Sequence, residues 1–127
     1  MNSDRTNFNY LTEKIIGCAF EVSNILGCGF LEKVYERALV QELRAIGLRV
    51  EPQYPISVYY KKTIVGNFCA DILVEKSILV ELKALNYLDS NHQAQCLNYL
   101  KASNLNLCLL INFGKPKVEI KRIIRNT

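Results

Sequence analysis

A helix pattern enclosed between two apolar strand patterns constrains the fold of this chain more than any other feature. Residues 78–84 and 107–112 are short, apolar segments typical of buried strands. Between them, Asp89 or Ser90 can cap a helix that reaches Ala102. A helix that connects two strands of one sheet forms a right-handed crossover, which makes the two strands parallel. The sequence therefore predicts a sheet with a parallel pair and a helix packed on it.

The rest of the chain predicts two helices before this unit and further strands around it. Apolar residues recur at helical spacing over 8–26 and over 30–46, and Gly47 follows where a C′ glycine is favoured. Alternating apolar and polar residues predict strands at 56–60, 64–74 and 118–124. We therefore predict one α/β (α+β) domain over residues 1–127, in which helices flank a mixed central sheet.

Composition excludes several classes of protein. Half of the 127 residues are apolar and 22% are charged, which indicates a globular chain rather than a disordered one. Apolar runs such as 107–111 are far shorter than the roughly 20 residues of a membrane span, and the first ten residues lack the apolar core of a signal peptide. The five cysteines, without CxxC spacing, favour reduced thiols. We expect a cytoplasmic protein that does not contact a membrane.

All of the net charge of +4 lies in the last thirteen residues. The first 114 residues carry equal numbers of basic and acidic side chains, whereas the end of the chain has a clear basic excess. Such a segment can bind the backbone of a nucleic acid, and it can equally be the solubilising charge of an edge strand. The basic residues are Lys115, Lys117, Lys121, Arg122 and Arg125.

Charged residues interrupt the strands that should be buried. Glu81 and Lys83 are about 6.6 Å apart on one face of strand 78–84, because alternate residues of a strand share a face. Asp71 precedes the apolar residues 72–74 on the strand before. An isolated buried charge costs several kcal/mol. These three side chains therefore need partners or an ion.

The turn between these strands decides whether Asp71 meets Glu81. A two-residue turn at Lys76-Ser77 would place the two carboxylates on opposite faces. A three-residue turn or a bulge places both on one face together with Lys83, and we predict this odd-length connection. Facing carboxylates suit a hard divalent cation; without one they repel, and one of them keeps its proton.

Two helices supply further candidates. Glu32 falls about 60° from the centre of the apolar stripe of its helix, so it can face the sheet, although the helix dipole alone also favours a glutamate in a first turn. His92, Gln95 and Tyr99 share one face of the third helix at spacings of three and four. An ordinary polar helix face produces the same pattern.

Taken together, these residues resemble the GxxExxY protein family, a branch of the PD-(D/E)xK nuclease superfamily. The resemblance covers nearly the whole chain, and its elements occur in the family's order on the expected helices and strands. Ala70 stands where the superfamily name has proline. The matching elements are Gly29, Glu32 and Tyr35, then Asp71, then Glu81-Leu82-Lys83, and finally Gln95 with Tyr99.

The resemblance implies a restriction-endonuclease-like αβββαβ core with an extra N-terminal helix and an extra C-terminal strand. It also implies a nuclease that hydrolyses phosphodiester bonds in DNA with Mg²⁺ or Mn²⁺. In that family Asp71, Glu81 and the Leu82 carbonyl would hold the ion, and Glu32 would be a further ligand or would orient water bound to it.

The remaining family positions would complete the catalytic site. Lys83 would position the attacking water or stabilise charge on the phosphate, and Gln95 and Tyr99 would shape the site. The basic residues at the end of the chain would then contact the DNA backbone. An alternative is a non-catalytic module on the same fold that binds nucleic acid or another protein. Because 127 residues leave little beyond the core, a homodimer or a partner protein could supply specificity.

Overall fold

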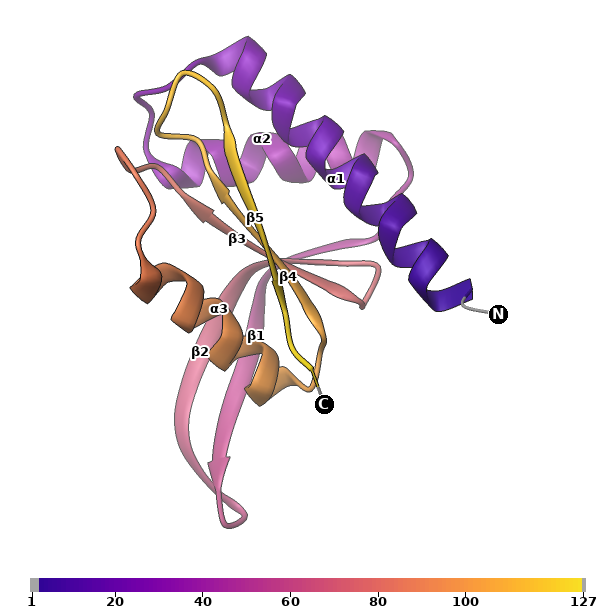
Figure 1. Cartoon of the computed structure of the whole chain (residues 1–127), viewed down its shortest axis with the longest axis vertical. Helices are drawn as coiled ribbons and strands as arrows, with labels where there is room; N and C mark the ends of the chain where they lie inside the picture. Colours follow the sequence, from indigo (N-terminus) through magenta and orange to yellow (C-terminus); the bar gives the residue numbers. More distant parts are fainter. Residues whose placement is uncertain (1–2, 127) are drawn as a thin grey trace.

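The computed structural model describes residues 3–126, with side chains from Phe8 onward, and this part contains three helices and one five-stranded mixed sheet (Figure 1). The predicted α+β fold class is confirmed. None of the helices in the described range is long and apolar enough to cross a membrane. The elements are α1 (Ser3–Leu26), α2 (Glu32–Ala45), β1 (Val50–Tyr60), β2 (Thr63–Val74), β3 (Ile78–Lys83), α3 (Ser90–Ser103), β4 (Leu107–Asn112) and β5 (Glu119–Ile124).

The strands lie in the order β1-β2-β3-β4-β5. Neighbouring strands are antiparallel except β3 and β4, which are parallel and are connected by α3. The parallel pair that the sequence predicts is therefore present. A capping box starts α3, because the Asp89 side chain accepts hydrogen bonds from the amides of Asn91 and His92 while the His92 side chain accepts from the Asp89 amide.

Helices cover both faces of the sheet (Figure 1). Helices α1 and α2 pack on one face, whose core includes Leu39, Ile72 and Val80. Helix α3 packs on the other face, where Leu79 and Leu100 are buried. Because residues alternate along a strand, Glu81 and Lys83 share the face of Leu79 and point toward α3.

Strand β1 begins earlier than the sequence predicts. It starts at Val50 rather than at residue 56 and includes Pro52 and Pro55. Proline lacks the N–H that a central strand donates to its neighbour, but β1 is the edge of the sheet and hydrogen-bonds only to β2. The edge position therefore explains why both prolines fit within a strand.

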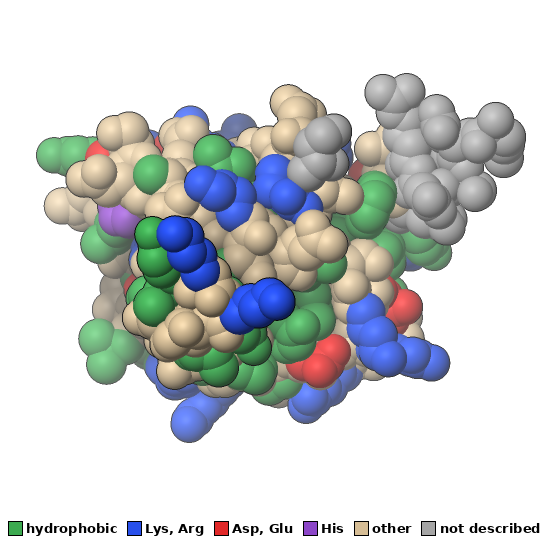
Figure 2. Space-filling view, turned by 90° about the horizontal axis from the view of Figure 1, so that it is seen from below, with side chains coloured by type: hydrophobic (Ala, Val, Ile, Leu, Met, Phe, Trp, Pro, Cys, Tyr) green, Lys and Arg blue, Asp and Glu red, His purple; other side chains and the backbone are tan. Residues whose placement is uncertain are grey.

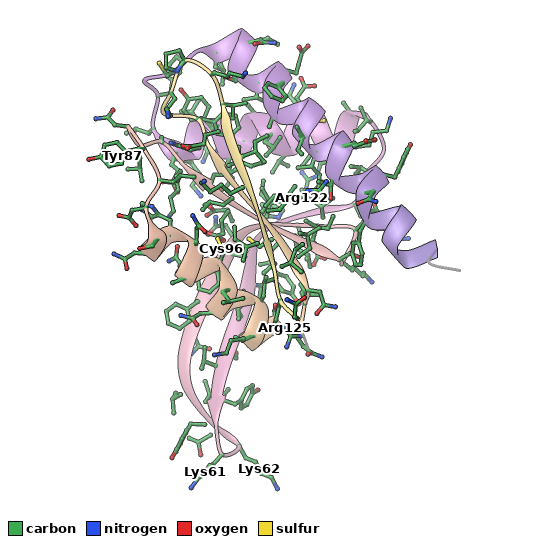
Figure 3. The ribbon with its side chains drawn as sticks, in the orientation of Figure 1. Lys61, Lys62, Tyr87, Cys96, Arg122 and Arg125 are labelled. Atoms are coloured by element: carbon green, nitrogen blue, oxygen red, sulfur yellow. The ribbon has the colours of Figure 1, made fainter. Side chains whose placement is uncertain are left out.

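Strands β1 and β2 form a long hairpin that extends beyond the rest of the sheet (Figure 1). Only residues 72–74 of β2 pair with β3. Lys61 and Lys62 form the tip, and both side chains point outward (Figure 3). The two lysines have φ angles of 47° and 73°, in the left-handed region where an Asn-Gly pair is favoured in a two-residue hairpin turn.

We expect the double substitution Lys61→Asn and Lys62→Gly to raise the free energy of unfolding by about 1 kcal/mol, because left-handed backbone costs about that much for an ordinary residue. Urea unfolding monitored by circular dichroism measures the change. Lys76→Gly in the other hairpin turn, where φ is 56°, is a matched positive control. An unchanged or lower stability would contradict the prediction.

Candidate metal centre

Asp71 and Glu81 face each other at the point where β2 separates from β3. The ladder between the strands pairs Val74 with Ile78 and ends at Ile72 and Val80, so three residues connect the strands. The predicted odd-length connection is confirmed. Asp71 and Glu81 occupy the next opposed positions beyond the ladder, which places both carboxylates on one face.

The two carboxylates take the place of ladder hydrogen bonds beyond this point. The Asp71 amide donates to Glu81 Oε1 at 2.9 Å, and the Leu82 amide donates to Asp71 Oδ2 at 2.7 Å. Each side chain therefore binds the backbone of the opposite strand. These reciprocal bonds fix both carboxylates while β2 turns away into the long hairpin.

The Leu82 carbonyl is aimed at the same place. The N–H and C=O of one strand residue project from the same edge of the strand. The Leu82 amide points to Asp71, so the Leu82 carbonyl also projects toward β2. Residues on either side of Leu82 bond toward β4 instead, since Lys83 O accepts from the Phe113 amide at 2.8 Å.

Burial makes ionisation of both acids unfavourable. Glu81 is 4% exposed, and burial, together with the nearby charge of Asp71, raises the pKa of Glu81 to about 9. Burial also raises the pKa of Asp71, although the hydrogen bond from the Leu82 amide opposes that shift. In the absence of a cation, Glu81 therefore holds a proton at neutral pH.

The donor set fits a small hard cation. Within the described residues no buried side-chain oxygen lacks a hydrogen-bond partner, and Asp71 Oδ1 and Glu81 Oε2 make no hydrogen bond there. Solvent can therefore reach these second oxygens. No three acidic, histidine or cysteine side chains among those described, from Phe8 to Asn126, converge on one ion. Mg²⁺ needs only one or two carboxylates, because water and substrate phosphate complete its shell.

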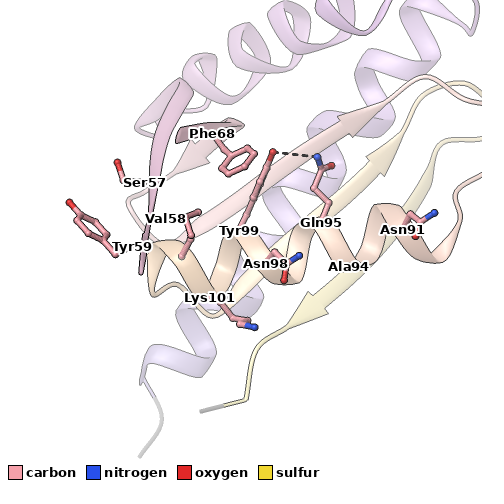
Figure 4. A pocket seen from close by; sticks show the side chains of 11 residues that line it. Ser57, Val58, Tyr59, Phe68, Asn91, Ala94, Gln95, Asn98, Tyr99 and Lys101 are labelled. Atoms are coloured by element: carbon pink, nitrogen blue, oxygen red, sulfur yellow. Dashed lines mark hydrogen bonds between the residues drawn. The ribbon is translucent and has the colours of Figure 1, made fainter. Parts of the chain in front are cut away.

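Lys83 is held next to this pair by α3. Lys83 Nζ donates to Gln95 Oε1 at 3.4 Å, and Gln95 Nε2 donates to the Tyr99 hydroxyl at 3.3 Å (Figure 4). Burial, followed by the charges of Glu81 and Asp71, raises the pKa of Tyr99. The structure thus joins Lys83, Gln95 and Tyr99 into one hydrogen-bonded chain beside the carboxylates.

Asn112 fixes the backbone as it leaves Lys83. Its fully buried side chain accepts hydrogen bonds from the amides of Leu85 and Gly114 and donates to Leu85 O. A Cβ on Gly114 would lie 2.2 Å from Leu85 O, so only glycine fits there. This role of Asn112 was not predicted, although a polar residue at the end of an apolar strand is the signal that could have indicated it.

The GxxExxY residues build the loop that leads to Glu32. The Tyr35 hydroxyl donates to Gly27 O at 2.6 Å and accepts from the Phe30 amide at 3.2 Å, while the Tyr35 ring stacks on Phe113. Gly29 has a φ of 115°, which favours glycine. The motif therefore anchors the first turn of α2.

Glu32 lies at the start of α2 and remains exposed. Partial burial and then the charge of Asp71 raise the pKa of Glu32, and Lys83 lowers it. These couplings place Glu32 within electrostatic range of the carboxylate pair. Among the described residues, no hydrogen bond joins Glu32 to Asp71 or Glu81.

A second glutamate near the pair was not predicted. Glu36 is buried, accepts a hydrogen bond from Gln53 Nε2 at 3.0 Å, and pairs with Lys33 Nζ at 3.3 Å. Its charge contributes to the raised pKa of Asp71. The available signal was the spacing of four residues from Glu32, which places both glutamates on one face of the helix.

The basic residues at the end of the chain are distributed over different parts of the surface. Lys115 and Lys117 follow β4 at the end of the strands where Lys83 is the last residue of β3, because Lys83 and Asn112 are paired. Lys121 and Arg122 are neighbours in β5 and therefore point to opposite faces. Arg125 donates hydrogen bonds to Leu105 O and Asn104 Oδ1 at the other end of the sheet (Figure 3).

A facing carboxylate pair followed by a lysine, on a mixed sheet with a crossover helix, offers oxygen ligands for a divalent cation beside a positive charge, the combination that suits metal-assisted phosphodiester hydrolysis. The family model of the PD-(D/E)XK nuclease superfamily matches residues 9–123, and the chain belongs to this superfamily. Nucleases of this superfamily typically use divalent metals. No curated protein matches the chain.

A similar fold occurs in a solved structure titled "Crystal structure of SSO0001". The two chains share 17% sequence identity with a TM-score of 0.60. The similarity covers 98% of this chain but 62% of the other one, so the present chain spans less than two thirds of that protein. At this identity the comparison supports the fold alone.

Proposed function

We propose that this chain is a Mg²⁺- or Mn²⁺-dependent nuclease that hydrolyses phosphodiester bonds in DNA. The observation that carries the proposal is the reciprocal bonding of Asp71 and Glu81 where β2 leaves β3, with Lys83 next along the same face. Membership of the nuclease superfamily supports the same reaction. Within the superfamily we assign the chain to the GxxExxY branch, because Gly29 and Tyr35 shape the loop that carries Glu32.

The side chains of Asp71 and Glu81 and the carbonyl of Leu82 would hold the ion. Such an ion, when bound, supplies Lewis-acid stabilisation of the phosphate and makes water a better nucleophile. The chain's own contribution is to present two oxygens that solvent can reach, on side chains whose other oxygens are fixed to the backbone. Fixed ligands avoid reorganisation during the reaction.

Lys83 would stabilise the negative charge that develops on the phosphate. Its ammonium group is directed by Gln95, whose amide is in turn oriented by Tyr99. Partial burial and the charge of Asp71 raise the pKa of Glu32, so Glu32 is electrostatically coupled to the carboxylate pair. We assign to Glu32 the orientation of the attacking water, which needs a hydrogen-bond acceptor at that side of the site.

Lys115 and Lys117 would contact the DNA backbone. They lie at the sheet edge where Lys83 ends β3, and the Asn112 side chain fixes the first residues of this loop. Phosphate contacts position a nucleic acid without reading its sequence. Arg125 already bonds to Leu105 and Asn104, so we assign a structural role to it.

Purified wild-type protein and Asp71→Asn should be incubated with single- and double-stranded DNA and Mg²⁺, Mn²⁺ or a chelator. We expect products from the wild type with either ion and none from the variant, because asparagine removes a negatively charged ligand. Glu51→Gln is the matched control, since Glu51 is exposed on β1. Products that persist in the chelator or in Asp71→Asn would refute the assignment.

A folded wild-type protein that binds DNA but forms no product with either ion would favour the alternative, a non-catalytic nucleic-acid-binding module. Binding by such a module should weaken steeply as salt increases, because phosphate contacts release counterions. The cleavage assay and a binding titration across salt concentrations together distinguish the two functions.

A further inference from the structure

A groove runs between the β1–β2 hairpin and α3 and ends at the candidate site. Its volume is about 730 Å³, which is in the range of clefts that bind small molecules. Figure 4 shows the lining side chains from both elements. They include Phe68 from the hairpin and Asn91, Gln95, Asn98, Tyr99 and Lys101 from α3.

Aromatic rings form the floor of this groove. Phe68 and Tyr99 lie 5.8 Å apart between ring centroids and are tilted by 41° (Figure 4). Phe68 remains 48% exposed although it sits beside another ring. An exposed ring in a groove is a platform on which an unpaired base can stack, whatever the base.

The walls of the groove carry polar and positive side chains. Asn91, Asn98 and Lys101 line it along α3. Residues 57–68 and 90–103, which form the two walls, contain no aspartate or glutamate. Seen from the tip of the hairpin, the middle of this end of the molecule presents hydrophobic and basic side chains, with acidic ones toward its margin (Figure 2). The groove is therefore complementary to a chain of phosphates with unpaired bases.

The hairpin tip extends the positive charge beyond the groove. Lys61 and Lys62 occupy left-handed turn positions that an Asn-Gly pair would fill with less strain. The other end of the groove meets the candidate site through Gln95, which lines the groove and accepts a hydrogen bond from Lys83. A strand lying in the groove would thus lead from the hairpin tip to the carboxylate pair.

We propose that this groove binds an unpaired segment of DNA, with a base stacked on Phe68 and Tyr99 and a phosphate paired with Lys101. The proposal rests on the proposed nuclease function and adds its substrate class, which is single-stranded DNA or a single-stranded flank. A duplex keeps its bases stacked inside and offers no base face to the rings.

The test measures binding with cleavage switched off by a chelator. Fluorescence anisotropy compares labelled dT₁₂ with a 12-base-pair duplex. We expect dT₁₂ to bind at least tenfold more tightly. Phe68→Leu should weaken dT₁₂ binding about fivefold to tenfold, because it removes the ring but keeps apolar bulk. Tyr10→Leu, at an exposed tyrosine of α1, is the aromatic control and should bind like the wild type.

The contribution of the Lys101 charge to DNA binding is tested by Lys101→Gln, with Lys76→Gln at an exposed lysine as its control. Lys101→Gln should lower the slope of log affinity against log salt by about 0.7, the value for one phosphate contact with a single strand. Phe68→Leu should leave that slope unchanged. Circular dichroism melting checks that each variant folds.

Several outcomes would overturn the groove assignment. The assignment would be wrong if the duplex bound as tightly as dT₁₂, if Phe68→Leu bound dT₁₂ with wild-type affinity, or if rU₁₂ bound more tightly than dT₁₂. It would also be wrong if the protein eluted as a dimer on size exclusion and Phe68→Leu dissociated this dimer without changing the affinity for dT₁₂. If the protein cleaves duplex DNA and Phe68→Leu and Lys101→Gln change neither binding nor cleavage, the nuclease function is retained and the groove assignment is rejected. Groove-dependent dT₁₂ binding without cleavage under any ion would leave the groove standing without the nuclease.

Discussion

Lys83→Ala should lower the single-turnover rate of DNA cleavage by about 10²- to 10³-fold at saturating Mg²⁺, which is the usual cost of losing one fixed electrostatic donor. Lys83 follows Glu81 on the same face of β3, and its ammonium is tethered to Gln95 at 3.4 Å. The tether removes the cost of directing a flexible side chain when charge develops on the phosphate. Affinity for DNA should fall only severalfold, because a single ion contact is lost.

The role of the tether has its own variants. Gln95→Ala keeps the ammonium but frees it, so we expect a smaller loss of rate, about tenfold. Lys83→Arg keeps the charge with a different shape and should recover part of the rate lost in Lys83→Ala. Lys76→Ala is the control, because Lys76 is exposed in the β2–β3 turn. A rate in Lys83→Ala within threefold of the wild type would exclude Lys83 from catalysis.

Most of the fold could be predicted from local patterns. The strand–helix–strand unit around residues 78–112 fixed the parallel pair, and the alternation in β3 placed Glu81 and Lys83 on one face. The start of β1 could not be predicted in the same way, because Pro52 and Pro55 are compatible with a strand only at a sheet edge. Edge position is a property of the whole sheet and not of the segment.

The candidate site shows a similar division. The pairing of Asp71 with Glu81 could be predicted from an odd number of residues in the turn between β2 and β3, since side chains alternate along strands. The contributions of Glu36, Asn112 and Phe68 depend on tertiary contacts. Glu36 accepts a hydrogen bond from Gln53 of β1, and Asn112 bonds to Leu85, twenty-seven residues away along the chain. Phe68 lines the groove only because the β1–β2 hairpin extends beyond β3 and packs along α3.

The buried carboxylate pair should make the metal-free protein less stable as pH rises. The pKa of Glu81 in the folded chain is about 9, whereas its ordinary value is 4.5. Between these values the folded chain holds a proton that the unfolded chain releases, so unfolding releases protons and stability falls as pH increases. The expected slope is on the order of 1 kcal/mol per pH unit in that window.

Glu81→Gln should therefore stabilise the metal-free protein at pH 8 by about 2 kcal/mol and flatten the pH dependence, because glutamine keeps an acceptor for the Asp71 amide and needs no proton uptake to be neutral in the folded chain. The same variant should lose cleavage and lose the stabilisation that added Mg²⁺ gives the wild type by mass action. Urea unfolding from pH 5 to 9, with chelator or Mg²⁺, measures both effects, with Glu51→Gln as the control.

A variant less stable than the wild type at pH 8 would show that Glu81 is ionised and fully compensated within the fold. A stable variant that still gains stability from Mg²⁺ would place the ion elsewhere. Stabilisation combined with loss of activity is the result expected when a protein retains a costly buried acid for its function rather than for its fold.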